Sequence, residues 1–260
     1  MCGKRATLAM AIAVDAMEEM VPGGYQSVMD IIVPGPILPY TQTQRYTCSE
    51  RHKWIRPKGF GTITLYQKGY DKSDHDIVAF LHNDLEIHEK GWDVRVLREF
   101  QNPQVGVVGF GGSLQHGHTN IYKISYDYRQ LGRFHYYSNV SDWQKHGKQF
   151  TGQRDVATLD GFALIVRREL LEKMGGWQIS KWPPHHNYDY RLTLEANRHN
   201  YKVRLVGVSC HHHGGGMAVS PEYQEWCQST KWGADAEMHK VGHRMCYEEY
   251  RDVLPVKVNS

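Results

Sequence analysis

The sequence predicts an α/β protein in which a mostly parallel, Rossmann-like sheet carries helices on both faces. Short apolar runs with many β-branched residues recur along the chain, each bounded by polar or glycine-containing segments. Stretches with apolar residues at helical spacing lie between several of these runs. Strands that alternate with helices favour parallel pairing, because a parallel neighbour requires a crossover connection.

The expected strands are the apolar runs. They cover Leu8–Val14, Met29–Val33, Asp76–Leu81, Val105–Phe110, Ala163–Val166 and Val203–Val208. The expected helices cover Gly91–Phe100, Arg168–Met174 and Tyr188–Arg198. The first of these helices places an apolar stripe on one face, formed by Trp92, Val96, Leu97 and Phe100.

Two segments break this alternation. Residues 111–158 contain no long apolar run and are dense in His, Tyr, Gly and Gln, which is typical of a long functional loop. Residues 221–260 combine aromatic and charged side chains, and we expect them to fold as helices back onto the domain. The whole chain of 260 residues fits one large α/β domain.

Composition limits the class of protein. A hydrophobic fraction of 40% is enough for a sizeable core, and a net charge of +3 permits an anionic ligand without requiring one. The five cysteines include no Cys-x-x-Cys pair, so a reducing compartment is the simpler interpretation. No apolar run approaches the roughly 20 residues of a membrane span. We therefore expect a soluble, cytoplasmic protein.

The most informative segment is Asp76–Glu86, in which an apolar strand leads directly into His82, Asn83 and Asp84. Open α/β sheets bind ligands at the carboxyl ends of their strands, so these side chains are candidates for a site. An Asn-Asp pair after a strand is also an ordinary turn, and this motif alone does not decide between the two.

Further motifs follow in a fixed order. They are the strand Val105–Phe110, Asp160-Gly161 ahead of another strand, Gly175-Gly176-Trp177, Tyr188-Asp189 at the start of a helix, and His211-His212-His213 followed by three glycines. This series, over about residues 60–216, resembles the family-2-type glycosyltransferases of the A-type fold. The resemblance implies transfer of a sugar from a nucleotide-diphosphate donor to an acceptor hydroxyl.

The resemblance also implies a divalent metal. In that family the last carboxylate of a short acidic motif holds the ion on the diphosphate, and here that carboxylate is Asp84, with Asn83 orienting the nucleotide. His82 occupies a position that is usually acidic. His212 matches a strand-end histidine that is a further ligand in metal-dependent members. Mn²⁺ and Mg²⁺ both suit a carboxylate, and an imidazole shifts the preference toward Mn²⁺.

Asp189 is the expected general base, in a Glu-Asp pair whose glutamate is replaced by Tyr188. A carboxylate that removes the acceptor proton would support inversion by direct displacement. We expect it to face the metal site rather than bond its own helix backbone, although the alternative is an aspartate that stabilises its own helix end. By the same resemblance, Asp160 and Gly161 lie near the donor sugar or the acceptor.

The amino-terminal third fits the family pattern least well. Asp15 could contact the nucleotide base or ribose, but Pro34-Gly35-Pro36 replaces the usual Asp-x-Gly-Ser motif. Lys68 could meet a phosphate or be a surface lysine. We expect a UDP-sugar donor, a nucleotide-sugar-binding half at 1–110, an acceptor and catalytic half at 111–220, and an extension at 221–260.

The acceptor stays open between a saccharide and a hydroxymethylated DNA base. DNA would be bound by Arg129 and Arg133 beside stacking aromatics, which are Tyr126, Tyr128, Phe134, Tyr136 and Tyr137. The alternative from another class is a histidine-rich metal-binding or nucleic-acid-binding protein without catalysis. The 16 histidines include His185-His186 and His211–His213, but regular ligand spacing is missing.

Overall fold

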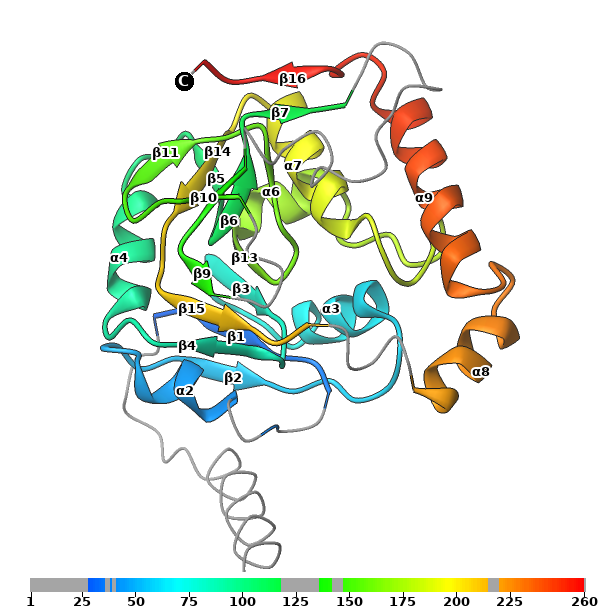
Figure 1. Cartoon of the computed structure of the whole chain (residues 1–260), viewed down its shortest axis with the longest axis horizontal. Helices are drawn as coiled ribbons and strands as arrows, with labels where there is room; N and C mark the ends of the chain where they lie inside the picture. Colours follow the sequence, from blue (N-terminus) through cyan, green and yellow to red (C-terminus); the bar gives the residue numbers. More distant parts are fainter. Residues whose placement is uncertain are drawn as a thin grey trace, which may run out of the picture.

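The computed structural model describes residues 28–35, 38, 41–117, 136–141, 147–214 and 220–259. Its centre is a seven-stranded sheet in the order β11-β14-β5-β13-β3-β1-β2 (Figure 1). These strands are β1 (Asp30–Ile32), β2 (Lys53–Ile55), β3 (Ile77–Leu81), β5 (Val105–Gly109), β11 (Gln153–Asp155), β13 (Ala163–Arg167) and β14 (Lys202–Val206).

Most strands of this sheet run in one direction. β1 is parallel to β2 and β3, and β14 is parallel to β5. β13 lies between β3 and β5 and is antiparallel to both, so β3 and β5 themselves point the same way. β11 is antiparallel to β14 at the edge. The predicted α/β class with a mostly parallel sheet is therefore confirmed, with one reversed strand near its centre.

Side chains of each central strand alternate between two hydrophobic layers, as the two-residue period of a strand requires. On β3, Val78 and Phe80 pack with α3 (Thr62–Tyr70), α6 (Arg168–Lys173) and α7 (Tyr188–Arg198). Ala79 and Leu81 of β3 pack on the other face with α4 (Trp92–Glu99). Figure 1 shows α4 on one side of the sheet and α6 and α7 on the other.

Several predicted elements are confirmed. The runs from Met29, Asp76, Val105, Ala163 and Val203 form β1, β3, β5, β13 and β14, and the three predicted helices are α4, α6 and α7. The expected strand Leu8–Val14 lies outside the described residues. A short helix, α2 (Thr41–Tyr46), precedes β2.

Residues 111–158 contain short strands that the sequence did not predict. A four-stranded sheet has the order β10-β8-β6-β12, formed by β6 (Gly111–Ser113), β8 (Tyr136–Ser138), β10 (Lys148–Gln149) and β12 (Thr158–Leu159). A three-stranded sheet has the order β4-β15-β9, formed by β4 (Leu85–Ile87), β9 (Val140–Ser141) and β15 (Cys210–His212). Residues 118–135 and 142–146 lie outside the described part of the chain.

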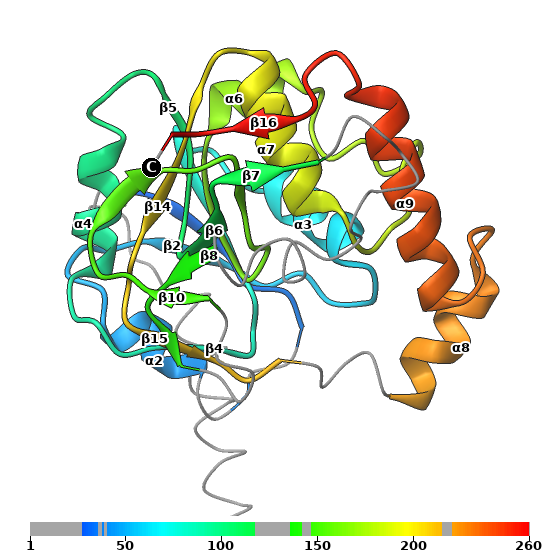
Figure 2. The same cartoon turned by 45° about the horizontal axis from the view of Figure 1, so that its top comes forward.

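The C-terminal segment folds into α8 (Pro221–Ser229) and α9 (Asp235–Glu249), which lie along one side of the molecule (Figure 2). Cys246 and Tyr250 pack into the core layer that contains α7. The chain then forms β16 (Val256–Lys257), which pairs with β7 (Gln115–His116). None of the helices in the described residues has the length and apolar character needed to span a bilayer.

Candidate functional site

The site begins at the carboxyl end of β3, where the buried strand gives way to the turn Asn83–Asp84 before β4. The buried side chain of Gln44, on α2, supports this turn: its amide nitrogen donates to the carbonyl oxygens of both His82 and Leu85 at 2.8 Å. On the other side the backbone N–H of His213 donates to the Asp84 carbonyl at 2.9 Å. Two distant segments therefore fix the position of Asp84.

Asp84 lies beside two imidazoles. Its Oδ1 atom is 3.3 Å from Nε2 of His212 and 3.6 Å from Nδ1 of His82. These two nitrogens are 3.3 Å apart. The side chains of His82, Asp84 and His212 are 27%, 20% and 21% exposed, so a small ligand can reach them from solvent. The structure thus brings together the two predicted metal ligands, Asp84 and His212, and adds His82.

Strand alternation explains why His212 faces this cluster while its neighbours do not. His212 is the last residue of β15, and its ring stacks on Phe162 with centroids 5.1 Å apart. His211 and His213 contact each other, with ring centroids 4.3 Å apart, and they reach Ser141 and Glu86 respectively. Successive side chains of a strand point to opposite faces, which separates His212 from the other two.

His82 also contacts the first residue of α7. Its Nε2 atom lies 2.6 Å from the hydroxyl of Tyr188. Burial lowers the pKa of His82 to about 4, against the opposing charge of Asp84, so the ring is neutral at pH 7. Burial likewise raises the pKa of Tyr188 well above its usual range, and its hydroxyl stays protonated.

Asp84 is ionised. Burial opposes its charge, but the two neighbouring imidazoles outweigh this effect and hold its pKa below the usual range. Its Oδ1 atom is buried and accepts no well-formed hydrogen bond. A buried carboxylate oxygen that accepts no well-formed hydrogen bond and has two imidazole nitrogens within 3.6 Å is better placed to bind a cation, together with those nitrogens, than to accept a hydrogen bond.

The second carboxylate, Asp189, lies in the first turn of α7, directly after Tyr188. Burial and then the charge of Asp160 raise its pKa to about 7, which is suited to a general base. Its Oδ1 atom accepts the backbone N–H of Tyr190 at 2.9 Å. The expectation that this carboxylate would not bond its own helix is therefore wrong: the free N–H groups of a helix start attract a carboxylate placed there.

Asp160 and Gly161 lie on the same side of the molecule as Asp189. Asp160 accepts a hydrogen bond from the hydroxyl of Tyr136 at 3.0 Å. A Cβ on Gly161 would lie 2.5 Å from the hydroxyl oxygen of Tyr188, so glycine is required for this ring to pack here. Tyr136 is the one residue of the predicted aromatic surface that the structure places against a candidate site residue among those it describes.

The remaining predicted donor-binding residues have other surroundings. The Asn83 side chain lies against Gly35, where a Cβ would be 2.9 Å from its amide nitrogen. Lys68 is exposed on α3, with its Nζ atom 4.0 Å from the position of a Cβ on Gly59. Asp15, Arg129 and Arg133 lie outside the described residues. No contact joins Lys68 to the Asp84 cluster, and its phosphate role stays a prediction.

The residues on either side of Lys68 have structural roles. The Oε1 atom of Gln67 accepts the backbone N–H of Trp177 at 2.7 Å. A Cβ on Gly69 would lie 2.5 Å from the Ile32 side chain, which explains the glycine. Gln67 and Gly69 therefore pack α3 onto the core. This packing explains why they are present, so they are not evidence that Lys68 binds a phosphate.

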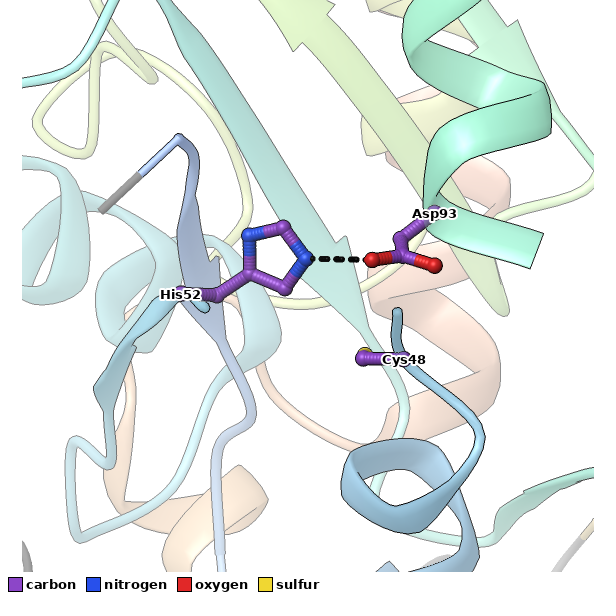
Figure 3. Close-up of side chains that lie close together, drawn as sticks. All are labelled: Cys48, His52 and Asp93. Carbon is purple, nitrogen blue, oxygen red and sulfur yellow. Dashed lines mark hydrogen bonds and ion pairs between the residues drawn. The ribbon is translucent and has the colours of Figure 1, made fainter. Parts of the chain in front are cut away.

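A separate cluster of metal-ligating side chain types joins Cys48, His52 and Asp93 (Figure 3). Nε2 of His52 lies 2.9 Å from Oδ2 of Asp93, and neither side chain is exposed. The same carboxylate accepts the backbone N–H groups of Ser49 and Glu50. Burial raises the pKa of the Cys48 thiol far above neutral. This cluster anchors the chain before β2 to α4. The Asp93 carboxylate already accepts hydrogen bonds from Ser49 and Glu50 and contacts His52.

Comparison with known proteins decides the family. The model of a family described as "Glycosyltransferase like family" matches residues 62–250, which is most of the chain. The chain belongs to this glycosyltransferase-like family. The match extends beyond the motifs quoted from the sequence and takes in α8 and α9, and the transferase assignment inferred from the sequence is confirmed.

Similarity to individual proteins is low. No curated protein matches the sequence. Among solved structures, the transferase is similar to the A197 protein of STIV, with 14% identity, TM-score 0.39, and coverage of 70% of this chain and 83% of that one. It is also similar to the mannosyltransferase PcManGT of Pyrobaculum calidifontis in complex with GDP-Man and Mn²⁺, with 12% identity, TM-score 0.45, and coverage of 92% and 80%.

Sequence reasoning missed two parts of the site. The sequence places His82 among the candidate site residues but does not predict it as a metal ligand, and it does not single out Gln44 at all. The position of His82, two residues before Asp84 at a strand end, was a usable signal. Gln44 gave none, because its partners are 38 and 41 residues away in the chain.

Proposed function

We propose that this transferase moves a sugar from a nucleotide-diphosphate donor to an acceptor hydroxyl with a divalent ion bound by His82, Asp84 and His212. The cluster of one ionised carboxylate and two imidazoles supports this proposal most strongly. Such an ion neutralises negative charge on the departing diphosphate. Two nitrogen ligands beside one carboxylate favour Mn²⁺ over Mg²⁺.

Tyr188 supports the proposed ligand role of His82. When Nδ1 of His82 keeps its lone pair for an ion, Nε2 carries the proton and donates it to the Tyr188 hydroxyl oxygen. Metal-bound histidines commonly have such a partner, which fixes the tautomer and the ring orientation. The Nε2 to hydroxyl distance of 2.6 Å fits this arrangement.

The proposed general base is Asp189. An acceptor hydroxyl becomes an effective nucleophile when its proton is removed during attack on the anomeric carbon. A carboxylate with a pKa of about 7 accepts that proton near neutral pH. One carboxylate beside the diphosphate and a second that takes the acceptor proton are the groups that inversion by single displacement needs. A helix-stabilising role for Asp189 is compatible with this, because a carboxylate can accept several hydrogen bonds at once.

The acceptor class remains a choice between a saccharide and a hydroxymethylated DNA base. Aromatic side chains stack on both. Tyr136 and Tyr137 are the described members of the aromatic set, and Tyr136 is buried beside Asp160. The DNA alternative depends on Arg129 and Arg133.

The test is a thermal-shift screen of UDP-, GDP- and TDP-sugars with Mn²⁺ present, since a ligand that binds the native state raises the unfolding midpoint. We expect stabilisation by one nucleotide class, UDP-sugars first, in the wild type and in Asp189→Asn. Stabilisation should disappear in Asp84→Ala and after removal of Mn²⁺. Equal stabilisation of Asp84→Ala by the same donor would contradict the proposed site.

A further inference from the structure

A second group of histidines lies where the loop before α7 meets α9. Nε2 of His186 is 2.6 Å from Oδ1 of Asp235, the first residue of α9. His185, His186 and Asp235 each offer one ligand atom, and these three atoms lie within 4.8 Å of one another. All three side chains are partly exposed. None of them belongs to the Asp84 cluster.

A further imidazole stands on the same face of α9. His239 follows Asp235 by four residues, one helical turn on, so both side chains point toward the loop. Its ring centroid lies 5.0 Å from that of His186, while the rings of His185 and His186 are 4.4 Å apart. Two imidazoles and one carboxylate thus form a compact group, and His239, whose Nε2 atom also lies 3.2 Å from Nε2 of His243, stands beside it.

The loop backbone holds this arrangement in place. His186 and Asn187 both have positive φ angles, 67° and 55°, a conformation that non-glycine residues rarely adopt. The Asn187 side chain fills the space over Gly242 of α9, where a Cβ would lie 2.1 Å from its Oδ1 atom. A strained backbone that is held in place by packing against a neighbouring helix is typical of functional sites.

The ligands also have the outer contacts that metal sites use. Nδ1 of His185 accepts the backbone N–H of Thr62 at 3.4 Å and lies 2.8 Å from the Thr62 hydroxyl oxygen, so an ion would bind at Nε2 with loss of its proton. The Tyr223 hydroxyl donates to the Asp235 carboxylate. Hydrogen bonds of this kind orient histidine and carboxylate ligands.

We propose that His185, His186, Asp235 and His239 bind a structural zinc ion. Neutral imidazoles and a carboxylate are zinc ligands, and four of them complete a tetrahedral site. The ion would join α9 to the loop that ends at Tyr188 and Asp189, and so hold the start of α7 in position. This proposal does not depend on the transferase mechanism, because it uses none of the residues assigned to it.

The experiment measures zinc in the full, untagged chain, in an Asp84→Asn background that disables the other cluster. After equilibrium dialysis against Zn²⁺, this protein should hold one zinc per chain, and zinc should raise its unfolding midpoint. Adding His186→Gln should weaken zinc binding more than about tenfold and abolish the stabilisation. The matched control is His199→Gln, which alters a histidine paired with Glu195 away from the cluster and should leave both unchanged.

Two outcomes would overturn the proposal. One is an Asp84→Asn protein that binds no zinc. The other is equal zinc affinity in the His186→Gln and His199→Gln proteins. If His186→Gln does not fold, Asp235→Asn removes the ligand charge while keeping the side chain's size, and it must give the same loss of zinc. Co²⁺ substitution adds an independent readout, because four-coordinate Co²⁺ absorbs strongly in the visible range and the six-coordinate aqueous ion does not.

Discussion

Nε2 of His82 and the hydroxyl of Tyr188 lie 2.6 Å apart, although the two residues are 106 positions apart in the sequence. They are also two of the positions at which the chain deviates from the family motifs that it resembles. His82 stands where the metal motif is usually acidic, and Tyr188 replaces the glutamate that precedes the proposed general base. Their contact indicates that the two deviations are coupled: an imidazole beside Asp84 needs a neutral hydroxyl at this place, because the ring is partly buried and uncharged.

Tyr188→Phe tests this coupling. The change removes only the hydroxyl, so His82 loses the partner that orients it, and we expect Mn²⁺ to bind about 10–100-fold more weakly. Isothermal titration with Mn²⁺ in the presence of donor measures this. Tyr201→Phe, which removes a hydroxyl bonded to Lys173 on the protein surface, is the matched control and should bind Mn²⁺ normally. Unchanged affinity in Tyr188→Phe would show that the contact is incidental.

Asp189→Asn tests the general base. The amide keeps the size of the side chain and an oxygen that accepts the Tyr190 N–H, but it cannot take a proton from the acceptor. We expect turnover to fall by about 10²–10⁴-fold while the donor Kd stays within about twofold. Steady-state kinetics and calorimetry measure the two quantities. Near-normal turnover with an intact fold would mean that Asp189 only stabilises its helix.

The same residue predicts a pH dependence. Because the base works only when ionised, kcat/KM should rise with pH and level off above about 7, the pKa to which burial and Asp160 raise Asp189. Asp160→Asn removes the neighbouring negative charge, so the rise should move to lower pH. The pH at which kcat/KM rises should still lie above the usual aspartate pKa range, because Asp189 stays buried in this variant. A profile that does not move, or that moves upward, would contradict a charge interaction between the two carboxylates.

Gly161→Ala tests the packing of the site. The added Cβ would meet the Tyr188 hydroxyl oxygen at 2.5 Å and ring carbons at 2.7 Å, so the ring must shift. Overpacking of this kind costs about 1–3 kcal/mol of unfolding free energy. Urea denaturation measures it, with Gly152→Ala as the control, where the nearest atom is a phenyl carbon at 3.2 Å. Equal stability of the two variants would show that the ring moves freely.

The parts of the fold that follow from local pattern were predictable. Tyr188–Arg198 forms a helix with the predicted bounds because its apolar spacing extends over three turns. β3 and β13 are continuous apolar runs, as buried central strands require, although nothing in either run reveals that β13 is reversed. The strands within 111–158 were missed because runs of two or three residues show no period.

The candidate site was predictable where a motif marks a strand end or a helix start, as at Asp84, His212 and Asp189. It was not predictable where the chain brings distant residues together. The contact of His82 with Tyr188 and the support of the Asn83–Asp84 turn by Gln44 arise only from tertiary packing. The same holds for His186 and Asp235, whose contact spans 49 positions without any regular ligand spacing.

The metal dependence of donor binding tests the central claim most directly. Calorimetry measures the Kd of the nucleotide sugar selected by the thermal-shift screen, for the wild type, Asp84→Asn and Asp189→Asn, with Mn²⁺ and after treatment with EDTA. Removing the ion should weaken wild-type and Asp189→Asn binding at least about tenfold, because an ion beside a diphosphate contributes several kcal/mol. Asp84→Asn should bind weakly in both conditions. Tight donor binding and full turnover by the EDTA-treated wild type would contradict a metal site at His82, Asp84 and His212.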